Sequence, residues 1–117
     1  MGRTQLQDAV PMTLGQEFNA FADTLSEEIH RIEENVSLLY EINLGGTAIG
    51  TGINANNEYR EKAVRYLSGY TGLPLKIASN LVEATSDTGA FVMFASTIKR
   101  LAIKLSKISS DLRLLSS

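Results

Sequence analysis

The chain has 117 residues, of which 44% are hydrophobic, and a formal net charge of −2. This length fits one domain or a part of a larger one, and the apolar content is enough to bury a core. The charge argues against general nucleic-acid binding, the lack of cysteine excludes disulfides and thiolate chemistry, and no apolar run approaches the roughly 18 residues of a membrane span.

A polar stretch opens the chain at residues 2–11, GRTQLQDAVP. It combines a guanidinium group, a hydroxyl, two amides and a carboxylate just before a helical pattern. The first turn of a helix has unpaired N–H groups and a positive dipole end, so polar side chains there suit anion recognition. The alternative is a polar lead-in to the helix without a role in binding.

A long helix is predicted over residues 13–43. Thr13 and Gln16 have the spacing of a capping box. Apolar residues then recur in steps of three and four, which is a helical seam with a near-heptad repeat. Its members are Leu14, Phe18, Phe21, Leu25, Ile29, Ile32, Val36 and Leu39. At 1.5 Å per residue such a helix is roughly 45 Å long.

Residues 45–54 contain four glycines within eight positions. A phosphate cradle is one interpretation, but no Gly-Lys-Ser/Thr ending follows, so a tight turn against neighbouring helices is favoured. Two short helices are expected after it. The first spans 58–68, with Asn57 as its N-cap and Gly69 at its end, and the second spans 79–85 after a connector at 70–77.

The last predicted helix starts near Ser86–Asp87 and continues to the end of the chain. Its apolar residues form a strict heptad seam, namely Phe91, Phe94, Ile98, Leu101, Leu105, Ile108, Leu112 and Leu115. A column of small residues lies beside it and permits close approach of another helix, namely Thr88, Ala95, Ala102, Ser109 and Ser116.

The predicted fold class is therefore all-α: an elongated bundle segment with two long antiparallel helices joined by a Gly-rich turn and short helices. Residues 1–117 are expected to be part of one central helical domain with no internal boundary. A compact globule of this length has a radius of gyration of only about 13 Å, so helices of roughly 45 Å need partners along their flanks.

The two long helices carry opposite charge. Seven acidic residues and one arginine lie between 13 and 43, whereas five basic residues and one aspartate lie between 88 and 116. Such helices can pair with each other or across an oligomer, with charge selecting partner and register. The alternative is that both charged faces are simply solvated.

No combination of residue types in these helices suggests catalysis by itself. His30 lies beside the apolar seam and is interpreted as an edge residue. The pairs Glu27–Glu28 and Glu33–Glu34 splay about 100° apart on a helix, which is poor geometry for shared acid–base work, and are interpreted as surface residues. Neither a metal site nor a cofactor site is predicted. Because the N-terminus also lacks a signal pattern, we expect a cytoplasmic protein that binds neither nucleic acid nor membrane.

Four blocks of the sequence resemble, in order and spacing, the aspartase/class II fumarase family: GRTQLQDAVPMTLGQEF, NLGGTAIGTGIN, EATSDTGAF and KLSKISSDLRLLSS. The resemblance covers essentially the whole chain. Fumarases typically place His after the Thr of the first block, where this chain has Gln5. Glutamine cannot titrate and only orients by hydrogen bonds, which favours the ammonia-lyase branch.

The resemblance implies a homotetramer whose central helices form one bundle, with each active site built from three subunits. In the ammonia-lyase branch, a serine on a mobile loop removes a proton from L-aspartate, and anti elimination gives fumarate and ammonia without a cofactor. Thr4 and Gln5 match positions that bind the substrate. Arg3, Gln7 and Asp8 are expected to support their turn.

The family continues to a Gly-Ser-Ser loop with the catalytic serine, and an upstream substrate block precedes the residues matched here. We therefore expect a central fragment with no catalytic residue of its own, inactive in isolation. Two alternatives stay open: a fragment of a class II fumarase, or a non-catalytic helical oligomerisation module.

Overall fold

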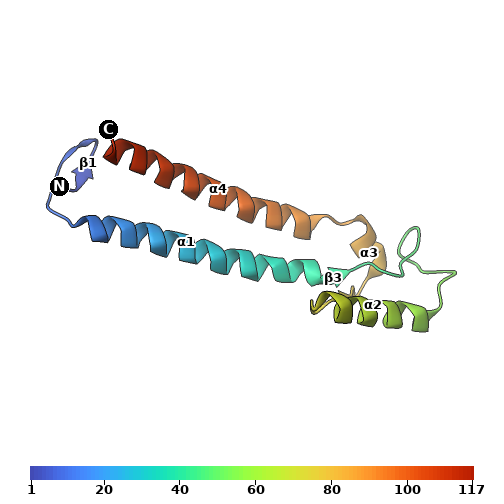
Figure 1. Ribbon diagram of the computed structural model, residues 1–117. Helices are drawn as coiled ribbons and strands as arrows, with labels where there is room; N and C mark the ends of the chain where they lie inside the picture. The colour runs from blue at the N-terminus through green and yellow to red at the C-terminus, as the bar shows by residue number, and fades with distance from the viewer. The chain divides into compact units, whose positions relative to one another are not determined.

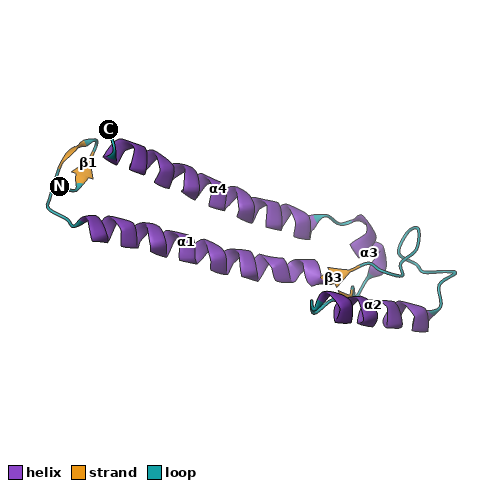
Figure 2. Ribbon diagram, in the orientation of Figure 1, coloured by secondary structure: helices purple, strands orange, loops and turns teal.

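The computed structural model describes all of residues 1–117, and 64% of them are helical, which confirms the all-α class (Figures 1 and 2). The four strands are only two residues long. The chain forms two compact units, one made of Met1–Ile32 with Thr97–Ser117 and the other of Glu33–Ser96. We call them the first and the second unit. The assignment of all 117 residues to one undivided domain stays a prediction.

The first unit contains a hairpin, most of helix α1 (Leu14–Val36) and most of helix α4 (Gly89–Leu115). Within it the two helices run antiparallel, as predicted, and the chain termini lie at the same end (Figure 1). The predicted capping box starts α1. The backbone N–H of Thr13 donates to Gln16 Oε1 at 2.9 Å, and that of Gln16 donates to Thr13 Oγ1 at 3.1 Å.

Helix α1 ends earlier than predicted. The α-helical part stops at Val36 instead of 43, and a 3₁₀ turn, η1 (Ser37–Tyr40), leads into strand β3 (Glu41–Ile42). Strand β3 pairs in parallel with β4 (Lys76–Ile77), with Ile42 opposite Ile77. Strand pairing with a segment distant in sequence thus overrides the local helical pattern. The local pattern could not predict this pairing.

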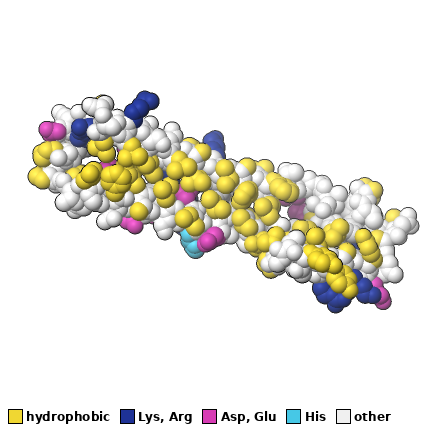
Figure 3. All heavy atoms as spheres, in the orientation of Figure 1, with side chains coloured by type: hydrophobic (Ala, Val, Ile, Leu, Met, Phe, Trp, Pro, Cys, Tyr) yellow, Lys and Arg dark blue, Asp and Glu magenta, His cyan; other side chains and the backbone are white.

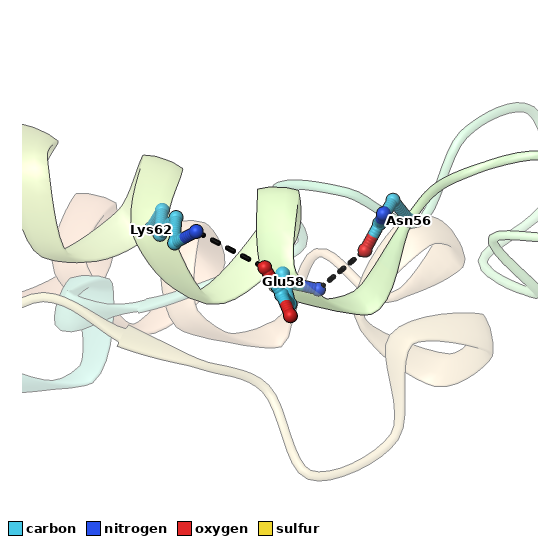
Figure 4. A network of polar contacts seen from close by, with 3 residues as sticks. All are labelled: Asn56, Glu58 and Lys62. Atoms are coloured by element: carbon cyan, nitrogen blue, oxygen red, sulfur yellow. Dashed lines mark hydrogen bonds and ion pairs between the residues drawn. The ribbon is translucent and has the colours of Figure 1, made fainter.

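The second unit holds helices α2 (Asn57–Thr71) and α3 (Leu81–Ser86). The predicted caps of α2 were wrong by one and three residues. Asn56, not Asn57, is the N-cap, because its Oδ1 accepts the N–H of Glu58 at 2.8 Å (Figure 4). The helix continues through Gly69, and Gly72 with a φ of 69° ends it, since the left-handed conformation falls there.

The interior of the second unit is small and apolar. Its buried hydrophobic residues are Val64, Ala78 and Leu81, at 4%, 4% and 8% exposure. The glycine-rich segment packs against the same helices. Gly50 has a φ of 91°, and a Cβ there would collide with the backbone of Leu81 at the start of α3. The prediction of a tight turn against neighbouring helices is confirmed.

The interior of the first unit is mixed, and the predicted seams were only partly correct. On α4 the inward residues include Leu101 and Ile108, but Ile98, Leu105 and Leu112 stay 42%, 43% and 39% exposed. A helix pair buries one stripe of each partner, so the second apolar row of the seam is left uncovered. Figure 3 shows apolar side chains on the visible face of the molecule.

Candidate active site

The polar stretch at the N-terminus forms a β-hairpin instead of a simple lead-in to α1. Strand β1 (Arg3–Thr4) pairs antiparallel with β2 (Gln7–Asp8), with Thr4 opposite Gln7. The backbone of Gly2 extends the ladder, since its N–H donates to Val10 O at 2.7 Å and its carbonyl accepts from Ala9 at 2.9 Å. Backbone hydrogen bonds within the stretch therefore hold it in this conformation.

Gln5 and Leu6 form the two-residue turn of the hairpin in an unusual conformation. Their φ angles are 52° and 62°. Positive φ at both positions is the type I′ pattern, for which Asn-Gly is the preferred pair and a leucine is unfavourable. Each such residue costs on the order of 1–3 kcal/mol, and strain of this kind gathers at functional sites. The turn is thus a candidate site on structural grounds.

A cavity of about 400 Å³ lies beside this turn within the first unit. Hairpin residues Arg3, Gln5 and Leu6 line one side of it, and Lys107 and Asp111 of α4 line another. Lys107 Nζ lies 2.5 Å from Asp111 Oδ2. The cavity can therefore offer a guanidinium, an ammonium and an amide to a polar ligand, together with two carboxylates, that of Asp111, which is already paired, and that of Glu17.

The structure brings only one of the two predicted substrate contacts to this cavity. Gln5 lines it, whereas Thr4 is exposed and is absent from its lining. Successive residues of a strand face opposite sides, so the side chains of Arg3 and Thr4 lie on opposite faces of the hairpin. Arg3, predicted as support only, reaches the cavity itself. Sequence reasoning did not connect Lys107 and Asp111 with the N-terminal stretch, although their spacing of four on a helix placed them on one face.

A second polar cluster lies deeper in the first unit. Glu28 of α1 has no exposed surface, and its Oε1 lies 2.8 Å from Arg100 Nη2 and 2.5 Å from Lys104 Nζ of α4. The Lys104 contact lies within hydrogen-bond distance, but neither oxygen of the Glu28 carboxylate has a partner of ordinary hydrogen-bond geometry. This contact, and the charges of Arg100 and Lys104, hold the pKa of Glu28 below its usual value against the opposing effect of burial.

This cluster shows whether the opposite charges of the two long helices pair or are simply solvated. Glu27 and Glu28 of the acidic helix face Arg100 and Lys104 of the basic helix within one chain. At least part of the complementary charge is therefore used inside the molecule. Glu28 had been interpreted as a surface residue, and that prediction was wrong because the helix pair turns it inward.

Comparison with known proteins places these features in a family. The sequence profile described as "Lyase" matches residues 1–117, the full chain. The chain belongs to the lyase family. The resemblance of its four sequence blocks to the aspartase/class II fumarase family is confirmed.

Curated relatives in this lyase family are similar over the whole chain. An aspartate ammonia-lyase of Pseudomonas aeruginosa is 64% identical, one of Escherichia coli K12 is 61% identical, and one of Corynebacterium glutamicum is 62% identical. The comparison covers 100% of this chain and 25%, 24% and 22% of those proteins. The chain thus spans about a quarter of the length of these relatives.

A solved structure agrees with the fold. A crystal structure of a fumarate lyase:delta crystallin from Brucella melitensis, bound to cobalt, is 63% identical and superposes with a TM-score of 0.96. It matches 99% of this chain, which covers 25% of that protein. Within this chain no group of three or more His, Cys, Asp or Glu side chains is placed to hold a metal ion. No helix is both long and apolar enough to span a membrane.

Proposed function

We propose that this chain is part of an aspartate ammonia-lyase, which converts L-aspartate to fumarate and ammonia. The observation that carries the proposal is 61–64% identity to such enzymes along the entire chain. Gln5 supports it further, because an amide orients a substrate by hydrogen bonds but does not titrate near neutral pH and so cannot act as a general acid or base. A class II fumarase is the competing assignment.

We assign Thr4 and Gln5 to substrate contact. Both residues are exposed at the end of a hairpin that backbone hydrogen bonds hold together, and Gln5 shares the cavity with Arg3. A hydroxyl, an amide and a guanidinium are suitable donors for the carboxylates of aspartate or fumarate. No residue of the 117 is assigned to proton abstraction.

The same proposal includes a cytoplasmic homotetramer. Its support is the exposed apolar surface of the long helices, where Phe18 and Ile29 of α1 are 50% and 60% exposed and Leu105 of α4 is 43% exposed. Exposed apolar side chains along helices favour an interface between subunits.

A chimera tests the assignment directly. This chain replaces the aligned 117 residues of the Escherichia coli aspartate ammonia-lyase, and the absorbance of fumarate follows turnover of L-aspartate. We expect deamination by the chimera and no hydration of fumarate to malate. Malate formation without deamination would assign the chain to the fumarases. Light scattering of the same chimera checks the tetramer.

Two matched amide variants test the substrate contacts. Gln5→Ala should lower kcat/KM for aspartate on the order of 10- to 100-fold, since a hydrogen bond to a charged group is lost. Gln7→Ala removes the same side chain from the opposite strand and should have a smaller effect. Thr4→Val removes only the hydroxyl and should resemble Gln5→Ala. Equal losses in Gln5→Ala and Gln7→Ala would contradict the assignment.

A further inference from the structure

The first unit contains one completely buried side chain, and it is charged. Arg100 Nη2 and Lys104 Nζ both contact the same oxygen of Glu28, Oε1. Lys104 Nζ also lies 3.5 Å from Glu27 Oε2. The lysine and arginine come from successive turns of α4, four residues apart. A buried carboxylate without a cation is strongly unfavourable. The ion pairs of Glu28 therefore require one register, that is, one position of α4 along α1.

The apolar residues of α4 do not specify that position. Leu101 and Ile108 face inward, while Ile98, Leu105 and Leu112 form the adjacent row, so both rows repeat every seven residues with aliphatic side chains. A slip of α4 by seven residues, about 10 Å, replaces one apolar residue with another, including Phe91 and Phe94 in one direction. Apolar packing alone therefore allows more than one register.

The polar residues distinguish these registers. A slip by seven residues in one direction brings Met93 and Thr97 to the positions of Arg100 and Lys104, which leaves Glu28 without a cation. A slip in the other direction brings Lys107 to the position of Arg100 and Asp111 to the position of Lys104, so Glu28 keeps one cation but meets a second carboxylate. Among these registers only the observed one supplies two cations to Glu28.

The register matters for the candidate site. The cavity beside the turn is lined by Arg3 and Gln5 of the hairpin and by Lys107 and Asp111, one and two turns beyond Lys104 on α4. We propose that Glu28, through Arg100 and Lys104, sets the register of α1 and α4 and is thereby a positioning residue for the cavity beside Gln5. The second part of this inference rests on the proposed function.

Spin-label distances measure the register directly. The chain has no cysteine, so Ser26→Cys on α1 and Ser106→Cys on α4, both at exposed positions, give one labelled pair per chain, and dilution with unlabelled chain leaves only the distance within a chain. We expect one narrow distance in the otherwise unsubstituted chain. Glu28→Gln should add a population displaced on the order of 10 Å. Glu27→Gln is the matched control and should keep the single distance, because Glu27 is exposed.

A charge exchange separates register selection from a general need for glutamate at 28. The fourfold variant Glu27→Lys, Glu28→Lys, Arg100→Glu and Lys104→Glu inverts every charge of the cluster and keeps each pair opposite in sign, so the single distance should return. A narrow, unchanged distance in Glu28→Gln would overturn the inference. So would a broad distribution in the chain without a cluster substitution, because the cluster would then not fix the register.

Kinetics in the chimera test the positioning role. Glu28→Gln should lower kcat/KM for aspartate about 10-fold, the charge-exchanged variant should recover it, and Glu27→Gln should leave it unchanged. An altered distance with unaltered kcat/KM would overturn the positioning role while the register assignment stands. An inactive chimera without substitutions would contradict the proposed function, and the distances would still decide the register.

Discussion

The two units fix their geometry in opposite ways. The first unit buries a charge, Glu28, between two long helices. The second unit buries Val64, Ala78 and Leu81 together with glycines whose backbone touches its neighbours. Ion pairs fix the position of the helices in the first unit, whereas close approach of backbone atoms fixes the packing of the second unit. Different substitutions should therefore damage each unit.

The largest loss of stability is expected from Gly50→Ala in the second unit. The added Cβ would overlap the Leu81 carbonyl and Val82 Cα, which are backbone atoms that cannot turn aside, at a φ of 91° that alanine disfavours. We expect a loss of about 3–5 kcal/mol in the free energy of unfolding, measured by urea denaturation followed by circular dichroism.

Gly69→Ala is the matched control for that substitution. Gly69 lies inside α2 with no heavy atom within 4 Å of an added Cβ. Alanine there should stabilise the protein by about 0.5–1 kcal/mol through its helix propensity. If Gly50→Ala behaved like Gly69→Ala, close backbone packing would not be what fixes the second unit.

The next largest effect is expected from Glu28→Gln in the first unit, with a drop on the order of 10 °C in the midpoint of thermal unfolding at neutral pH. The effect should depend on pH. The pKa of Glu28 is lower in the folded chain than its ordinary value of 4.5, owing to Lys104 and Arg100. Its charge therefore stabilises the fold fully above that value, and the contribution is lost as the pH falls through the lowered pKa.

Thermal unfolding between pH 3 and pH 7 checks this dependence. The midpoints of the unsubstituted chain and of Glu28→Gln should converge as the pH falls below about 4. Glu27→Gln, which removes the neighbouring exposed acid, should differ little from the unsubstituted chain throughout. A constant gap between Glu28→Gln and the unsubstituted chain would show that the charge of Glu28 is not what stabilises the first unit.

The sequence predicted the features that depend on near neighbours in the chain. The Thr13–Gln16 cap and the tight turn at residues 45–54 follow from short motifs and were confirmed. It could not predict the parallel pairing of Ile42 with Ile77, which joins distant segments. The inward rotation of Glu28 was equally hidden, because the apolar rows of the helices leave several pairings open.

The candidate site shows the same division. The polar composition near Gln5 pointed to the N-terminal stretch. The hairpin itself was missed because its turn uses Gln5 and Leu6, a pair that turn preferences disfavour. Lys107 was missed because it comes from the far end of the chain. Local strain and long-range contacts together define the site, and neither can be read from residue types alone.

A smaller effect separates two adjacent asparagines at the start of α2. Asn56→Ala should cost about 1 kcal/mol because the N–H of Glu58 loses its acceptor. Asn57→Ala should be neutral or slightly stabilising, because Asn57 already lies inside the helix. Urea denaturation of both variants measures the difference. The reverse order would restore the cap that the sequence predicted.

The smallest effect is expected at the exposed ion pair of the second unit, which is the counterpart of the buried cluster. Lys62 Nζ lies 3.0 Å from Glu58 Oε2, but the two side chains are 56% and 77% exposed (Figure 4). Water already solvates both charges, so Lys62→Gln should cost at most about 0.5 kcal/mol, and this cost should disappear in 1 M salt, where the screening length is only about 3 Å. The loss caused by Glu28→Gln should persist in the same salt, because no solvent reaches Glu28. Urea denaturation at low and high salt compares the two variants, and equal salt sensitivity would mean that burial does not distinguish the two ion pairs.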